Sequence, residues 1–280
     1  NYDIIVQSNQ MQQDRRNLKM KSRNEIERDR ETLRMVLKKM FSITEDAADN
    51  DAIRDRILSG GRITGTNMVV MICAILIASV GLNTDSVAVI IGAMLISPLM
   101  GSILAIAYGT AANDSYLIKR HSVGFLVQIL ISVATATLYF WLSPVKEPTE
   151  QLIARTNPTL FDVIIALAGG VAGIVGQTRK DKSNNIIPGV AIATALMPPL
   201  CTCGYAIANG NVRMLLGAFY LFILNTYFIF IASDIVLTLL KTPKIRAMSY
   251  KEWKRARKKM YRNTLFVLLP AVLIAIGWSI

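Results

Sequence analysis

The chain has 280 residues, of which 52% are hydrophobic and only 18% are charged, and its formal net charge is +12 at pH 7. A soluble domain carries about 25% charged residues, so this composition argues against an ordinary soluble protein and favours an integral membrane protein. The Lys and Arg residues cluster beside long apolar runs, which is typical of a membrane-topology signal and argues against nucleic-acid binding.

The first 63 residues form a charged segment that holds 24 of the 50 charged residues of the chain. Within it, residues 12–41 lack Pro and Gly, and their apolar residues recur at spacings of three, four and seven. This periodicity predicts an amphipathic helix. A second short helix is expected to end at Gly60-Gly61. We therefore predict a cytoplasmic or interfacial helical head over residues 1–63.

Seven apolar runs follow, each long enough to cross a hydrocarbon core of about 30 Å. They cover residues 66–82, 87–109, 123–143, 160–177, 186–208, 214–240 and 264–280. Between the last two runs, residues 248–263 are basic and contain aromatic residues, which predicts an interfacial helix that contacts anionic lipids. The expected organisation is thus a transmembrane core over 64–240, followed by this basic helix and a seventh span over 241–280.

The distribution of Lys and Arg predicts the orientation of these spans. With a cytoplasmic N-terminus, the later cytoplasmic loops carry fifteen Lys and Arg residues and the loops on the other side carry three. This bias follows the positive-inside rule. The sequence predicts a multi-pass protein of the bacterial inner membrane, with the N-terminus cytoplasmic and the end of the seventh span on the outer side.

Two apolar segments that lie 101 residues apart resemble each other. LISPLMGSILAIAYG (95–109) and LMPPLCTCGYAIANG (196–210) share seven of fifteen residues, including a proline and the closing glycine. The first segment lies in the second span and the other in the fifth, so the two spans cross in opposite directions. The simplest architecture is an all-α 3+3 inverted repeat, with halves 64–143 and 160–240 and the seventh span appended.

Prolines interrupt both copies of this repeat. A proline leaves carbonyls of the preceding turn without partners, and within a membrane such a break must be buried in protein or wet. In inverted-repeat folds, corresponding broken helices mark the site near the midplane. We therefore predict two Pro-broken helices whose crossing forms a substrate- or ion-binding site. Its residues are Ser97, Pro98, Gly101, Ser102, Thr194, Pro198, Pro199, Thr202 and Asn225. The alternative is that the prolines are structural kinks whose backbone groups are satisfied by neighbouring helices.

Other polar groups narrow the chemistry that this site can perform. Gln128 lies midway along the third span, where such a side chain usually bonds to a neighbouring helix. No Lys, Arg, Asp or Glu lies at the predicted midplane, which leaves neutral solutes, anions held by helix N-termini, or monovalent cations held by carbonyls. Cys201-x-Cys203 has the wrong spacing for a zinc site, and the single histidine, His121, is expected in a cytoplasmic loop. Without catalytic motifs, we expect no enzyme activity, no metal and no cofactor.

Two motifs carry a resemblance to a known family. GAMLISPLMG (Gly92–Gly101) and GVAIATALMPPL (Gly189–Leu200) resemble the domain-of-unknown-function 389 family, which consists of hydrophobic membrane proteins mostly of bacteria and archaea. The resemblance extends over about residues 62–240. It implies a membrane location and a helical fold, and it supplies no catalytic residues and no substrate. Ser102 stands where a proline is common after the first motif.

Two functions remain open from the sequence. The first is a transporter or channel for a small solute or ion, with its site at the crossing of the two broken helices. The other is a membrane scaffold or sensor that does not transport, and that acts through its N-terminal helices and its basic cytoplasmic segment. A homo-oligomer is expected in either case.

Overall fold

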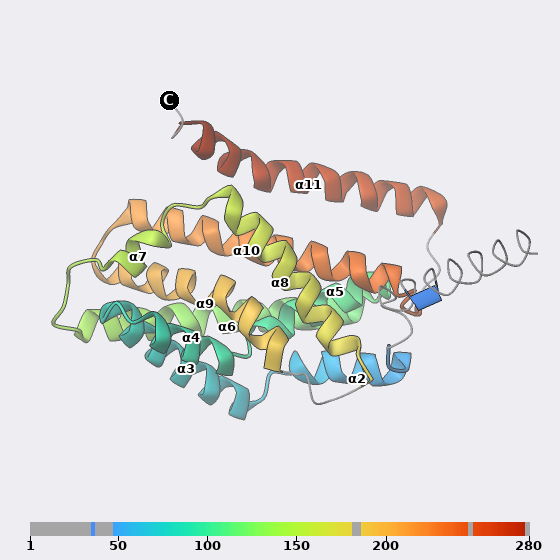
Figure 1. Cartoon of the computed structure of the whole chain (residues 1–280), viewed down its shortest axis with the longest axis horizontal. Helices are drawn as coiled ribbons and strands as arrows, with labels where there is room; N and C mark the ends of the chain where they lie inside the picture. The colour runs from blue at the N-terminus through green and yellow to red at the C-terminus, as the bar shows by residue number, and fades with distance from the viewer. Residues whose placement is uncertain (1–34, 37–46, 181–185, 246–248, 278–280) are drawn as a thin grey trace, which may run out of the picture. The chain divides into compact units, whose positions relative to one another are not determined.

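The computed structural model describes residues 35–36, 47–180, 186–245 and 249–277 (Figure 1). The chain divides into two compact units, Asn1–Ala47 and Ala48–Ile280. The predicted helix over 12–41 lies outside the described residues, apart from Met35 and Val36, which are helical. Within the described ranges the protein is helical and contains no β-strand.

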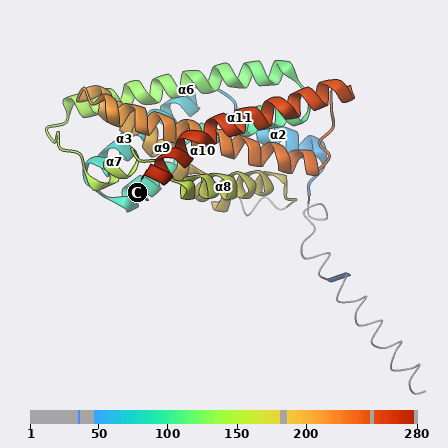
Figure 2. The same cartoon turned by 90° about the horizontal axis from the view of Figure 1, so that it is seen from above.

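The helices of the larger unit follow one another through short connections. They are α2 (Asn50–Gly60), α3 (Gly65–Asn83), α4 (Val87–Ile96), α5 (Leu99–Ala111), α6 (Ser115–Leu142), α7 (Glu150–Ala154), α8 (Leu160–Thr178), α9 (Ile186–Ala208), α10 (Val212–Leu239) and α11 (Tyr250–Gly277). The views in Figures 1 and 2 show α6 and α10, the two longest helices of the bundle, running along its long axis.

The apolar helices support a membrane protein with fewer clear spans than the sequence predicts. Four helices are long and apolar enough to cross a membrane, namely α3, α6, α8 and α10, and the bent pair α4–α5 makes a fifth when it is counted as one span. The expected seven spans are therefore not reached among the described residues. The expected fifth span corresponds to α9. The basic segment and the expected seventh span form one continuous helix, α11, instead of an interfacial helix followed by a separate span.

Four helices end in the same kind of turn. In each turn a backbone N–H donates to the carbonyl five residues earlier, as in a Schellman motif. The four donors are Ser86, Asp114, Asn211 and Thr242. The residue just before each has a positive φ (Asp85 54°, Asn113 55°, Gly210 66°, Lys241 56°). The first three turns lead directly into α4, α6 and α10, and they reverse the chain within a few residues. These turns are what places consecutive helices side by side and antiparallel.

Helix α9 lies at the centre of the bundle. It packs against α3, α4, α5, α6, α8 and α10. Gly204 permits its closest approach, because a Cβ there would lie 2.5 Å from the Cβ of Ala136 and 2.7 Å from the backbone nitrogen of Thr137 on α6. Small residues allow such close contacts between membrane helices. The outer faces of the bundle are apolar: Val123 and Leu130 on α6 are 64% and 61% exposed.

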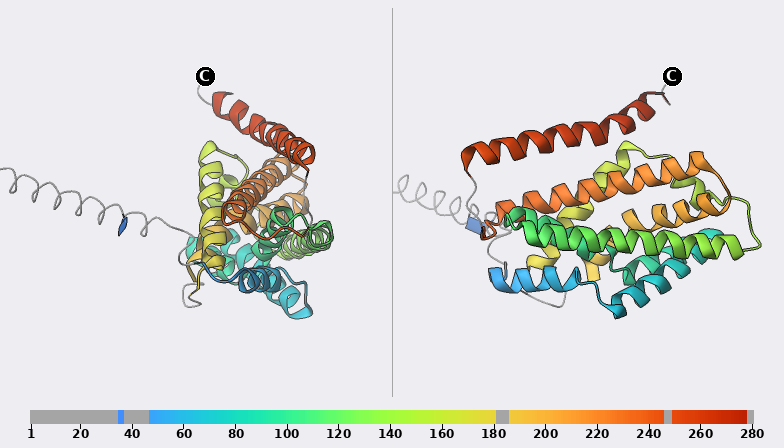
Figure 3. Two further views of the ribbon diagram at one scale, coloured as in Figure 1. Left: turned by 90° about the vertical axis from the view of Figure 1, so that its right-hand side faces the viewer. Right: turned by 180° about the vertical axis from the view of Figure 1, so that it is seen from behind.

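Helix α11 lies along the outside of the bundle next to α10, as both views in Figure 3 show. Two tyrosines of α10 connect the pair. The Tyr220 hydroxyl donates to the Val267 carbonyl at 2.7 Å, and the Tyr227 hydroxyl donates to the Met260 carbonyl at 3.1 Å. These bonds seat α11 on α10 through its backbone.

The two proline positions differ from each other. At the first, α4 ends at Ile96 and α5 begins at Leu99, with a bend of 48° across Ser97-Pro98. At the second, the expected break is absent, because α9 continues as a helix through both Pro198 and Pro199. Close packing on all sides holds the course of α9 although the prolines donate no backbone hydrogen bond.

Helix α2 was expected in the N-terminal head, and it packs against α5 within the larger unit. Ile53 and Ile57 of α2 are buried in one apolar cluster with Leu104 and Tyr108 of α5. The α2–α3 connection lies so close to the start of α5 that a Cβ on Gly61 would be 2.9 Å from the Gly101 carbonyl oxygen. The end of α2 is thus fixed on the helix that follows the Ser97-Pro98 break.

The close contact of α8 and α10 predicts a cost for a single added methyl group. A Cβ at Gly170 would lie 2.8 Å from the Ile229 carbonyl oxygen and 2.8 Å from the Ala232 Cβ. Gly170→Ala is expected to destabilise the protein by about 1–3 kcal/mol through overpacking. The control is Gly92→Ala at an exposed position of α4, where a Cβ would have nothing within 4 Å. Replacing a helical glycine by alanine adds about 0.5–1 kcal/mol of stability. Thermal unfolding in detergent compares the two variants, and equal unfolding midpoints would contradict the close contact of α8 and α10.

Candidate functional site

The bend between α4 and α5 places two serines of the predicted site in different surroundings. Ser97 is half-buried, and its hydroxyl oxygen lies 3.5 Å from the Leu99 backbone nitrogen, which donates to it. Ser102 is completely buried one turn into α5. Its hydroxyl donates to the Oε1 atom of Gln128 on α6 at 2.8 Å. Gln128 therefore bonds to a neighbouring helix, as expected for an amide at that depth.

Helix α6 presents a buried polar face to the interior. Gln128 and Ser132 lie four residues apart, and so on one face of the helix, and they are 1% and 0% exposed. The Ser132 hydroxyl has no hydrogen-bond partner among the described residues. The Ser79 hydroxyl of α3 is also fully buried, and it lies beside the Cys201 thiol of α9. Because α3 and α6 pack against each other, these hydroxyls add polarity to one apolar interior. The sequence analysis did not select Ser79 or Ser132, although the four-residue spacing from Gln128 was a usable signal for Ser132.

The proline segment of α9 is buried among apolar side chains. Pro198 and Pro199 are buried, and the Thr202 hydroxyl donates to the Pro198 carbonyl at 2.9 Å. The Cys201 sulfur lies 4.0 Å from the Ile75 carbonyl oxygen, which joins α9 to α3. Thr194 lies on α9, and its side chain is outside the described part of the structure. Thr202 therefore satisfies a carbonyl of the proline turn from within its own helix.

Asn225 is buried in α10, which packs on α9. Further along α10, the Thr226 hydroxyl and one carboxylate oxygen of Asp234 are buried without a hydrogen-bond partner among the described residues. No three His, Cys, Asp or Glu residues in the described ranges gather closely enough to hold a metal ion.

The structure brings the two predicted segments into one core. Helix α9 contacts both α4 and α5. Met94 and Leu99 from the first segment share a buried cluster with Met197 and Leu200 from the second. Gly101 is turned towards the α2–α3 connection, away from this cluster. The two segments thus meet in one packed apolar core, and the buried Ser102–Gln128 hydrogen bond joins α5 to α6.

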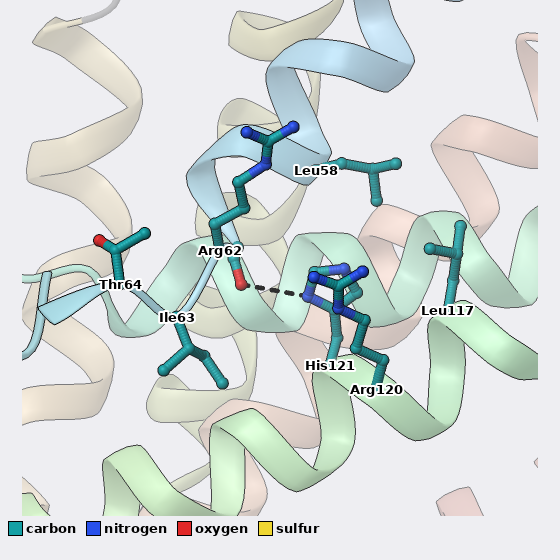
Figure 4. A pocket seen from close by; sticks show the side chains of 8 residues that line it. Leu58, Arg62, Ile63, Thr64, Leu117, Arg120 and His121 are labelled. Carbon is teal, nitrogen blue, oxygen red and sulfur yellow. Dashed lines mark hydrogen bonds between the residues drawn. The ribbon is translucent and has the colours of Figure 1, made fainter.

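A cavity of about 370 Å³ lies apart from this crossing, between the α2–α3 connection and the first turns of α6 (Figure 4). Its lining residues are Leu58, Gly61, Arg62, Ile63, Thr64, Leu117, Arg120 and His121. His121 is not in a loop, as the sequence analysis expected; it lies within α6 and is 6% exposed. Its Nδ1 atom lies 3.1 Å from the Gly61 carbonyl oxygen. Because a carbonyl only accepts, Nδ1 carries the proton in this bond.

The Ser102–Gln128 hydrogen bond predicts a pattern in a double-mutant cycle. Ser102→Ala leaves the buried Gln128 amide oxygen unpaired, and we expect a loss of about 0.6 to 1.7 kcal/mol, the range for such bonds in membranes. The double variant Ser102→Ala/Gln128→Leu removes both partners and should recover part of that loss.

Thr110→Val is the control for this cycle, because the Thr110 hydroxyl bonds only to the Ile106 carbonyl of its own helix, at 3.0 Å. Unfolding midpoints in detergent provide the comparison. Strictly additive losses in the double variant would show that the two side chains are not coupled.

Comparisons with known proteins agree with the two sequence motifs. Uncharacterized protein MJ0678 of the archaeon Methanocaldococcus jannaschii is 25% identical over 252 residues, which cover 90% of this chain and 72% of that protein. No solved structure matches the chain. Residues 94–231, from the end of α4 into α10, match the family described as Domain of unknown function (DUF389). The resemblance to this family seen in the sequence is therefore confirmed over these residues.

Proposed function

We propose that the protein is an integral membrane transporter or channel for a small solute or ion, and that its path passes through the bundle beside the crossing of α4–α5 and α9. The observation that carries this proposal is the set of buried polar side chains on α3, α5 and α6. Ser79, Ser102, Gln128 and Ser132 are each at most 1% exposed.

The energetic argument starts from the cost of burying polar groups. An unpaired hydroxyl in an apolar interior costs about 1–3 kcal/mol by protein mutational data. Ser132 lies in a bundle whose outer faces are apolar, and its hydroxyl has no partner among the described residues. Water or a polar solute beside α6 would satisfy this hydroxyl. A polar interior beneath an apolar surface is the arrangement that a permeation path requires.

The bend at Ser97-Pro98 adds backbone groups to this interior. A break of this kind leaves carbonyl and N–H groups without the partners that an unbroken helix supplies; at this bend the Ser97 hydroxyl accepts from the Leu99 N–H. Discontinuous helices of this kind hold substrates and ions in transporters. The hydroxyl and amide groups nearby are neutral, so the site suits neutral polar solutes or monovalent ions better than divalent cations, which prefer carboxylates.

A flux assay with a fixed panel of solutes tests the proposal. Liposomes containing the full chain are challenged with urea, glycerol, sodium chloride or potassium chloride, and volume recovery is followed by light scattering. For at least one solute we expect faster recovery than in protein-free liposomes. Because Ser132→Ala/Gln128→Leu removes both buried polar side chains of α6, we expect it to slow that flux at least tenfold.

The control for this assay is Thr110→Val, whose hydroxyl bonds within α5 and not to the Gln128 face. It should retain the flux of the unmodified protein. Flux at the protein-free level for the whole panel, or unchanged flux in Ser132→Ala/Gln128→Leu, would contradict the transport proposal. Either result would favour the other function considered from the sequence, a scaffold or sensor that acts through partner binding.

The proposed orientation places the N-terminus in the cytoplasm of a bacterial inner membrane, as the excess of Lys and Arg indicates. Cysteines introduced at exposed positions test it. Glu147→Cys, between α6 and α7, should react with a membrane-impermeant maleimide in intact cells. Lys241→Cys, after α10, should react only after permeabilisation. The opposite labelling pattern would show that the protein has the inverse orientation in the membrane.

A further inference from the structure

The cavity beside α2 and α6 carries two arginines and no carboxylate. Arg62 and Arg120 are both exposed, and neither Asp nor Glu is among the lining residues that the structure describes. Neither guanidinium forms an ion pair within the described ranges. Figure 4 shows Arg62 extending from the α2–α3 connection and Arg120 from α6, with the Gly61–His121 hydrogen bond joining the two elements. Such a pair of cations suits an oxyanion, above all a phosphate.

Other groups around the cavity increase its preference for an anion. Helix α3 begins at Gly65, directly after Thr64, so the positive end of the helix dipole lies next to the cavity. Thr64 caps this helix, and its hydroxyl accepts from the Asn67 backbone N–H at 3.3 Å. The remaining walls, Leu58, Ile63 and Leu117, are apolar. The cavity therefore combines a cationic rim with an apolar floor.

The depth of the cavity along the bundle identifies the source of the phosphate. From Arg120 to Leu142, α6 rises by about 33 Å at 1.5 Å per residue, close to the thickness of a hydrocarbon core of about 30 Å. The exposed side chains of this stretch are apolar from Val123 to Trp141, which is 66% exposed. On α3 the exposed apolar face begins with Val69, shortly after Arg62. Both arginines thus lie at the boundary between the apolar and the polar surface of the bundle.

We propose that this cavity binds the headgroup phosphate of an anionic phospholipid in the leaflet on the side where α3 begins. Arg62 and Arg120 hold the phosphate, and the acyl chains lie along the exposed apolar faces of α3 and α6. Ile63 lies between the headgroup and the acyl chains. Its side chain packs against Gly124 of α6, where a Cβ would leave it no space. This site is distinct from the basic segment 248–263, and it does not depend on the transport proposal.

Native mass spectrometry of the full chain in detergent tests the site. Phosphatidylglycerol and phosphatidylcholine with identical acyl chains are added separately, and the lipid retained per chain is measured. We expect preferential retention of phosphatidylglycerol, and at least a tenfold weaker retention in Arg62→Gln/Arg120→Gln. The ten Lys and Arg residues between Lys241 and Arg262 remain in this variant, so the loss would locate the site at the cavity.

Two matched controls keep the test specific. Arg54→Gln/Lys119→Gln removes the same charge from exposed residues that do not line the cavity, and it should retain lipid like the unmodified protein. The single variants Arg120→Gln and Lys119→Gln form a second comparison, between adjacent positions of α6 of which only Arg120 lines the cavity. Equal retention in the cavity and control variants would overturn the proposal. So would the displacement of phosphatidylglycerol by millimolar inorganic phosphate, which would make this a site for a soluble anion.

Discussion

The arrangement of this protein depends on the close packing of α9 against its neighbours. Gly204 and Ala136 bring the backbones of α9 and α6 together, so that a Cβ at Gly204 would lie 2.5 Å from the Ala136 Cβ. In a bilayer the hydrophobic effect gives little attraction between helices, and small residues that permit such contacts provide the packing energy instead. With α9 fixed at the centre, α4, α5, α8 and α10 each gain a surface on which to bury a face.

That packing also explains why two similar proline motifs give different backbones. Pro98 lies at the meeting of two short helices, where Ser97 has an extended backbone and the chain bends by 48°. Pro198 and Pro199 lie inside a helix with neighbours on every side, where a bend would open contacts with α6 and α10. The Thr202 hydroxyl donates to the Pro198 carbonyl. The same residue type therefore breaks one helix and is accommodated in the other, and the packing partners decide which.

Sequence patterns predicted the features that depend on local composition. The apolar runs predicted the positions of the long apolar helices. The motifs that begin at Gly92 and Gly189 indicated the family. Proline disfavours a helical conformation in the residue before it, and this rule predicts a break at both motifs. The chain follows the rule at Ser97-Pro98 and departs from it at Pro198, where α9 continues as a helix. The course of α9 and the location of His121 depend on tertiary contacts. His121 lies near charged residues in the sequence, and only the approach of the α2–α3 connection gives it the Gly61 carbonyl as a partner.

The α2–α3 connection contacts both the start of α5 and the first turns of α6. Gly61 is wedged so tightly that a Cβ there would lie 2.9 Å from the Gly101 carbonyl oxygen and 3.1 Å from His121 Nδ1. Gly101 belongs to the first turn of α5, directly after the bend, and Arg62 follows Gly61 in the chain. A shift of α5 about the bend must therefore push on Gly61, and with it on the arginine that lines the cavity. Packed interiors transmit such displacements because they have no free volume to absorb them. The broken helix and the cationic cavity are therefore in contact through Gly61.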